Sequence, residues 1–141
     1  MQADQIIATL GLEPHPEGGW YRQTWVAEGS ARPVGTCIYF LLKASEASHW
    51  HRVDAVEIWH FYAGAPLVLT FCADAAGPAR DIRLGADLAA GEVPQAIMPM
   101  GWWQAARTLG DWSLVGCTVS PGFRFEGFEL APAGFDIPRQ G

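Results

Sequence analysis

A histidine-rich stretch of the chain contains His49, His51 and His60 together with Glu57. Imidazole titrates near neutral pH, and both imidazole and carboxylate bind metal ions, so the residue types suit acid–base chemistry or a metal site. Side chains alternate along a strand, which predicts that His49 and His51 share one face and that His60 lies on the face opposite Glu57. A bend at residues 53–54 would let His51 and Glu57 converge on one site.

Large aromatic side chains accompany these polar groups. Trp59 and Phe61 share the predicted face of Glu57, and Trp102 shares a face with Gln104 on a later strand. Aromatic rings offer flat surfaces on which a sugar or another ring can stack. We therefore expect Trp59, Phe61, Trp102 and Gln104 to line a ligand pocket.

The elements that must position these residues are short. Glycines and prolines interrupt the whole chain, and the segments between them are rich in β-branched and aromatic residues, which is typical of strands. Strands are predicted at residues 21–26, 36–43, 50–53, 56–62, 67–72, 95–99, 102–106, 113–119 and 125–130. A helix is predicted over residues 4–10, capped by Asp4 and ended by Gly11. This pattern indicates one all-β sandwich or barrel domain over residues 1–141.

Composition restricts the function further. The chain has 15 acidic and 9 Lys or Arg residues, and the net charge of −6 disfavours nucleic-acid binding through a basic face. No apolar run is long enough to span a membrane, and the N-terminus lacks the basic start of a signal peptide. Three distant cysteines indicate a reduced, cytoplasmic protein. Few charges and seven tryptophans predict extra buried surface, in a pocket or a subunit interface.

The motif His49-x-His51, followed by Glu57 and Gly64, resembles the first signature of the cupin superfamily, and residues 99–104 resemble the second. Residues 14–22, 57–61, 103–106 and 116–123 are similar to a small single-domain cupin family, domain of unknown function 985. The resemblance implies a cupin double-stranded β-helix, an RmlC-like jelly-roll barrel with a short N-terminal helix. It also implies a small-molecule pocket inside the barrel and a homodimer.

The resemblance implies two kinds of enzyme. Metal-binding cupins use three histidines and a glutamate, so His49, His51, Glu57 and Gln104 form a candidate set for a divalent metal such as Fe, Mn, Ni or Zn, as in a dioxygenase. Two features depart from that pattern: Gln104 replaces the last histidine, and five residues separate His51 from Glu57 where three or four are usual.

The second kind resembles the sugar-nucleotide epimerases of the superfamily, which need no ion. In that case His51 is the base, Glu57 orients it, Tyr39 is the acid and Gln104 holds the substrate. The predicted ligand is a small polar molecule, either sugar-like or a carboxylate. A non-catalytic ligand-binding or sensory module is a third alternative.

The Pro- and Gly-rich segment at residues 14–19 has two interpretations. Its backbone restraints are typical of a structural corner, in which Glu17 accepts hydrogen bonds from exposed amides. Alternatively, Glu17 and Arg22 reach the pocket of the same or of the partner subunit, and Arg22 is then a ligand-binding residue.

Overall fold

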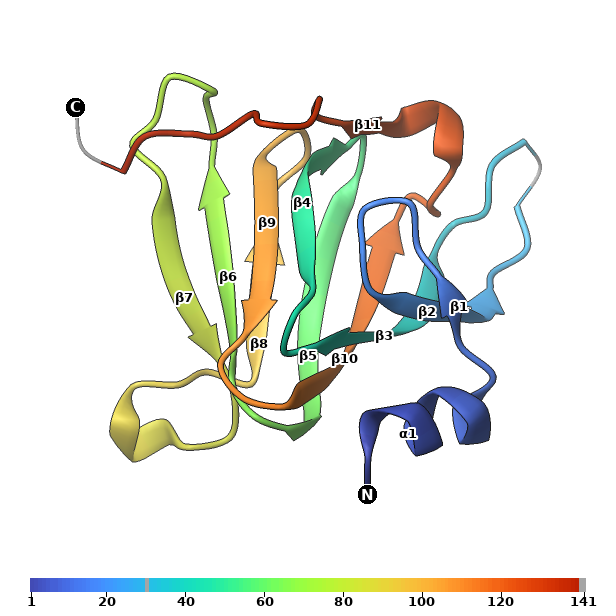
Figure 1. The fold of residues 1–141 in the computed structure, drawn as a ribbon. Helices are drawn as coiled ribbons and strands as arrows, with labels where there is room; N and C mark the ends of the chain where they lie inside the picture. The colour runs from blue at the N-terminus through green and yellow to red at the C-terminus, as the bar shows by residue number, and fades with distance from the viewer. Residues whose placement is uncertain (30, 140–141) are drawn as a thin grey trace.

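Antiparallel strands account for most of the structure, a computed structural model that describes residues 1–29 and 31–139 (Figure 1). Helix α1 (Ala3–Leu10) comes first. The strands are β1 (Glu13–Pro14), β2 (Trp20–Val26), β3 (Thr36–Lys43), β4 (Ala47–Val53), β5 (Val56–Gly64), β6 (Leu67–Cys72), β7 (Arg80–Leu84), β8 (Gln95–Met98), β9 (Trp103–Thr108), β10 (Trp112–Ser120) and β11 (Phe128–Leu130). Short 3-10 turns occupy Leu88–Ala90 and Phe125–Gly127.

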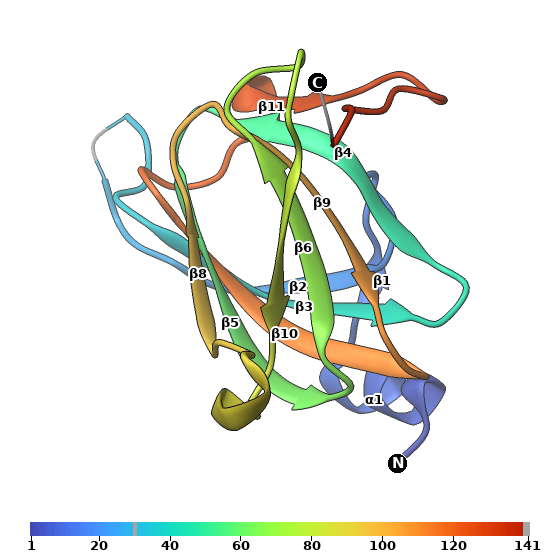
Figure 2. The same ribbon diagram turned by 90° about the vertical axis from the view of Figure 1, so that its left-hand side faces the viewer.

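The strands form two sheets that face each other (Figure 2). One has the order β1-β2-β3-β10-β5-β8, and the other has the order β11-β4-β9-β6-β7. Several neighbouring strands are far apart in the chain, since β10 lies between β3 and β5 and β9 lies between β4 and β6. This is the jelly-roll arrangement, so the predicted all-β fold is confirmed.

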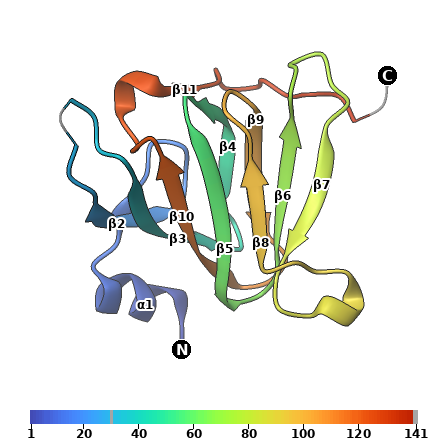
Figure 3. The same ribbon diagram turned by 180° about the vertical axis from the view of Figure 1, so that it is seen from behind.

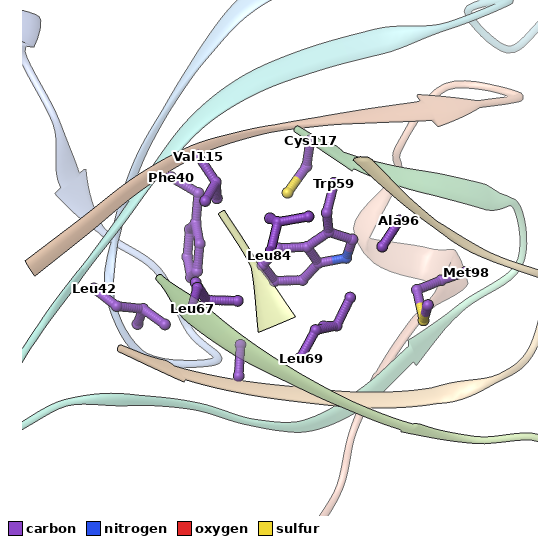
Figure 4. Packing of buried hydrophobic residues seen from close by; sticks show 11 residues of the cluster. Phe40, Leu42, Trp59, Leu67, Leu69, Leu84, Ala96, Met98, Val115 and Cys117 are labelled. Atoms are coloured by element: carbon purple, nitrogen blue, oxygen red, sulfur yellow. The ribbon is translucent and has the colours of Figure 1, made fainter. Parts of the chain in front are cut away.

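The interior is built by alternation along the strands. Phe40 and Leu42 of β3 point inward, as do Trp59 of β5 and Leu67 and Leu69 of β6, and all five are almost fully buried. Figure 4 shows these side chains packed against one another between the sheets. Burial of large apolar side chains stabilises a domain by about 1.5–3 kcal/mol each, so this cluster fixes how the two sheets pack.

Other parts of the chain cover the outer faces of the sheets. Helix α1 lies beside β2 and β3 (Figure 3), and its Ile6 packs with Leu41. The segment after β11 covers the other sheet, where Ile137 packs with Trp50 and Trp103. Among the described residues, no helix has the length and apolar character needed to cross a membrane.

Several boundaries differ from those predicted. The helix begins at Ala3 and is capped by Gln2 rather than by Asp4, although it ends at Gly11 as expected. Strands β1 and β7 were not predicted. Strand β1 has only two residues, and β7 is a mostly exposed edge strand with charged residues that lacks an apolar alternation. Residues 125–127 form a 3-10 turn, so the predicted last strand begins only at Phe128.

Candidate functional site

A cavity of about 110 Å³ lies between the two sheets. At roughly 10–15 Å³ for each water, it has room for a small molecule or for one part of a larger molecule. Its polar lining residues are His15, Glu17, Gln23, Thr36, His51 and Glu57. Its aromatic lining residues are Tyr21, Phe40, Trp59, Phe123, Phe125 and Phe128.

A bulge in β4 decides which of its side chains enter this cavity. The pairing of β4 with β9 shifts register between Ser48 and His51. Such a shift re-aims side chains, so Ser48 and His51 both reach the interior. His49 instead faces the outside, where its Nε2 lies 3.0 Å from the carbonyl oxygen of Pro132. The expectation that His49 and His51 share a face is therefore wrong.

The ring of His51 is held in one tautomer. Its Nδ1 lies 2.7 Å from the carbonyl oxygen of His49, which can only accept, so Nδ1 carries the proton. In the neutral ring the lone pair is then on Nε2. Burial lowers the pKa of His51, although the nearby Glu57 carboxylate raises it. At neutral pH the ring is thus an unprotonated base.

Glu17 reaches the cavity from the tight turn between β1 and β2. Within the turn, His15 N donates to the carbonyl oxygen of Gly19 at 2.9 Å. Gly18 has a φ of 108°, and a Cβ there would lie 2.1 Å from the carbonyl oxygen of Ala47. Only glycine allows the turn to pack so closely against β4. This close packing brings the Glu17 carboxyl to the residues of the β4 bulge.

The Glu17 carboxyl lies among three polar partners. Ser48 Oγ donates to Oε2, while Oε1 lies 3.4 Å from His15 Nδ1 and 3.6 Å from His51 Nε2. Burial raises the pKa of Glu17 to about 8, even though the hydrogen bond from Ser48 lowers it. A carboxyl that keeps its proton at neutral pH can act as a general acid.

The side-chain amide of Gln104 holds Glu57 in place through a hydrogen bond. Gln104 Nε2 donates to Glu57 Oε1 at 2.9 Å, and Gln104 Oε1 accepts from Trp59 Nε1 at 2.7 Å. Burial raises the pKa of Glu57 to about 7, with a further rise from nearby Glu17, while His51 and the Gln104 bond lower it. Both polar ends of Gln104 are therefore engaged within the protein, contrary to the expectation that it contacts a ligand or a metal.

Two predicted site residues lie on the wrong side of their strands. Tyr39 packs outside the barrel against Tyr62, with ring centroids 6.3 Å apart, because its neighbour Phe40 takes the inward position. Arg22 donates to the carbonyl oxygen of Leu10 at 3.1 Å. Strand alternation sends both side chains away from the cavity, and neither assignment to the pocket holds.

Two predicted aromatic residues also lie elsewhere. Trp102 precedes β9 and stacks on Phe71, with ring centroids 6.0 Å apart and planes 16° from parallel. Phe61 packs against the apolar core cluster and is not among the cavity lining residues. Of the predicted aromatic pair on β5, Trp59 alone lines the cavity.

The predicted metal ligands do not fit an ion. His49 faces away from the cavity and the Gln104 oxygen accepts from Trp59, so within the predicted set only His51 and Glu57 line the cavity. Within residues 1–29 and 31–139, no group of three or more His, Cys, Asp or Glu side chains is arranged to hold a metal. The donor geometry therefore gives no basis for a reaction step through a metal at this site.

His15 belongs to the site but was not expected there. Its Nδ1 accepts a hydrogen bond from Glu17 N at 3.1 Å, and its ring packs against Tyr21 with centroids 4.5 Å apart. Burial, with a smaller effect of His51, lowers the pKa of His15 to about 4. The sequence feature that could have indicated His15 as a site residue is its position in the segment at residues 14–19, two residues before Glu17.

Comparisons with known proteins agree with this architecture. The chain is 44% identical to a protein from Shewanella oneidensis, with a TM-score of 0.88 and coverage of 93% of this chain and 85% of that one. A hypothetical protein from Leishmania major is 30% identical, with a TM-score of 0.87 and coverage of 96% and 90%.

Oxalate decarboxylase from Bacillus subtilis is only 16% identical, with a TM-score of 0.64 over 83% of this chain and 29% of that one, and shares the fold. No curated protein matches the sequence. The model of the family described as cupin superfamily (DUF985) matches residues 4–131. The chain therefore belongs to this family of cupins.

Proposed function

We propose that the cavity binds a small polar carbonyl compound and catalyses an isomerisation or epimerisation by proton transfer. The observation that carries this proposal is the distance of 3.6 Å between His51 Nε2 and Glu17 Oε1 inside a buried cavity. A neutral imidazole and a carboxyl that retains its proton form a base and an acid ready at the same pH.

The reaction proceeds in two balanced steps. His51 Nε2 removes a proton from the carbon next to the carbonyl, and the electron pair of that C–H bond moves to give an enol, whose oxygen receives the proton of Glu17. Imidazolium and carboxylate are then neighbours, so their attraction offsets the cost of separating charge in a buried site. In the second step the His51 imidazolium gives its proton to the former carbonyl carbon while the Glu17 carboxylate takes the proton of the hydroxyl on the first carbon, which gives the isomer. For the epimer, water protonates the first carbon on its other face, Glu17 takes back the proton of the enol oxygen, and the imidazolium releases its proton to water.

Glu57 and Gln104 are positioning residues in this scheme. The Glu57 carboxylate favours the protonated form of His51, as its effect on the pKa of the ring indicates. Gln104 fixes Glu57 through one end and Trp59 through the other. Substitution of Glu57 or Gln104 would change the pKa or position of His51 but would leave the base itself in place.

The test follows exchange of substrate hydrogen for deuterium. Dihydroxyacetone, ribulose and fructose are incubated with the protein in D₂O, and loss of the C–H signal next to the carbonyl is measured by NMR. We expect exchange with at least one compound, and a fall of about 10²–10⁴-fold in His51→Gln. The control is His60→Gln, since His60 Nε2 lies 3.1 Å from Thr118 Oγ1, away from the cavity.

Two results would contradict the proposal. One is undiminished exchange in His51→Gln with wild-type folding. The other is saturable binding of a carbonyl compound without exchange, which would indicate a non-catalytic binding module.

A further inference from the structure

The described residues that line the cavity include no side chain with a permanent positive charge. Glu17 and Glu57 are acids, and none of the described lining residues is a lysine or an arginine. His15 and His51 are the only lining bases among the described residues. Their rings are engaged through Nδ1, one by Glu17 N and the other by the carbonyl oxygen of His49. The lining therefore offers no permanent positive charge.

Four arginines lie near the lining segments in sequence, and each already has a partner. Arg22, between the lining residues Tyr21 and Gln23, donates to the carbonyl oxygen of Leu10 at 3.1 Å, and the other three pair with carboxylates. Arg32 Nη2 lies 2.7 Å from Asp54 Oδ1, and Arg124 Nη2 lies 3.0 Å from Asp54 Oδ2. Arg52 in turn pairs with Glu129 at 2.8 Å. A ligand anion would therefore have to draw an arginine away from the carboxylate or carbonyl oxygen that it now contacts.

An anion inside the cavity would lose its water without gaining an ionic partner. A buried charge is costly unless it is paired, and here its polar neighbours would include Glu17 and Glu57. An uncharged hydroxyl or carbonyl group meets better partners, because the Glu17 carboxyl donates and His51 Nε2 accepts. The flat rings of Tyr21 and Trp59 suit the carbon skeleton of such a molecule.

We infer that the cavity selects uncharged hydroxy-carbonyl compounds and excludes carboxylates and phosphate esters. This inference rests on the proposed function and narrows it to one class of substrate. Of the two ligand classes expected from the sequence, it retains the sugar-like one and rejects the carboxylate.

The test compares compounds that differ in one charged group. Dihydroxyacetone, hydroxypyruvate and dihydroxyacetone phosphate are titrated at pH 7, and dissociation constants are measured by ligand-observed NMR. The series is repeated with fructose, 2-ketogluconate and fructose 6-phosphate. We expect each anion to bind at least tenfold more weakly than the uncharged compound of its series.

A charge-adding variant gives the matched test. Gln23 lines the cavity and is exposed, so Gln23→Arg adds a cation there without burying it. The anions are expected to bind at least tenfold more tightly to this variant than to the wild type. Gln95→Arg adds the same charge at an exposed position of β8 outside the cavity and is expected to leave binding unchanged.

Anions that bind the wild type as tightly as uncharged compounds would overturn the inference, as would anion binding that Gln23→Arg leaves unchanged. Selective binding of uncharged compounds without deuterium exchange would support the charge selection and contradict only the proposed proton transfer. Failure of every compound to bind would contradict the ligand pocket itself and both proposals with it.

Discussion

The Nε2 atom of His51 lies 3.6 Å from the Oε1 atom of Glu17, although the two residues come from segments that are distant in the chain. Glu17 follows β1 in one sheet, whereas His51 is on β4 in the other. The pair exists because the turn after β1 packs against β4, where His49 N donates to the carbonyl oxygen of Glu17 at 2.8 Å, so a displacement of this turn separates the base from the acid. The proposed chemistry is thus tied to the tertiary structure.

The first prediction concerns stability and pH. The pKa of Glu17 is about 8 in the folded protein against an ordinary 4.5, so the folded state keeps a proton that the unfolded chain loses. Its contribution to stability is therefore present at low pH and lost as pH rises to about 8. Between about pH 6.5 and about pH 8.5, we expect the free energy of unfolding to fall by about 2 kcal/mol.

Urea unfolding at several pH values checks this expectation. Glu17→Gln is expected to remove most of the decrease, because the amide does not titrate; the smaller part due to Glu57, whose pKa is about 7, remains. Glu13→Gln, at an exposed position of the same hairpin, is the control and is expected to retain it. An equal slope in wild type and Glu17→Gln would contradict the prediction.

The second prediction concerns the amide that joins Trp59 to Glu57. Gln104→Leu leaves the Trp59 indole N–H and the Glu57 carboxyl without this partner in a buried place. Loss of buried hydrogen-bond partners costs about 1–3 kcal/mol per group, so we expect a destabilisation of about 2–4 kcal/mol by urea unfolding. Trp59→Phe combined with Gln104→Leu is expected to cost less than the sum of the two changes.

A matched control for this change is Gln95→Leu, at an exposed glutamine on β8, which should alter the free energy of unfolding by less than about 0.5 kcal/mol. If Gln104→Leu is no more destabilising than this control, the two hydrogen bonds of Gln104 do not stabilise the site.

The third prediction concerns metal. Because the donor groups of the described residues are not arranged around an ion, dialysis against a chelator is expected to leave both Tm and deuterium exchange unchanged. Addition of Fe(II), Mn(II), Ni(II) or Zn(II) is expected to leave Tm unchanged as well. A stoichiometric metal whose removal lowers Tm, with the effect abolished in His51→Gln, would contradict this expectation.

The fourth prediction concerns self-association. Strand pairing places Trp25, Cys37, Thr118, Ile58 and Ile97 in one row across the sheet. At the two ends of the row, Trp25 is 56% exposed and Ile97 is 61% exposed. We predict that a second copy of the chain covers this row in a homodimer, which light scattering at micromolar concentration would detect.

The interface is tested by a charge in this row. Ile97→Glu is expected to give a monomer, because an unpaired carboxylate would be buried against the partner. Leu88→Glu, at a 68% exposed residue in a 3-10 turn, is the control and is expected to remain a dimer. A monomer mass for the wild type, or a dimer for Ile97→Glu, would argue against this interface.

Local patterns in the sequence determined the all-β fold and the family. They also predicted three residues that do line the cavity: His51, Glu57 and Trp59. Alternation along a strand is a property of the strand itself, so it predicts the inward face wherever the strand is regular. The same rule would have excluded Tyr39, because its neighbour Phe40 is the inward residue of β3.

Only the tertiary structure decided the rest of the site. The bulge between Ser48 and His51 depends on pairing with β9, and it turned His49 away. Glu17 lies beside His51 because Gly18 lets its turn approach β4 closely. These outcomes depend on register and contact between segments that are distant in the chain, and spacing within one segment carries no information about either. The sequence determined which strands form, and their packing decided which side chains meet.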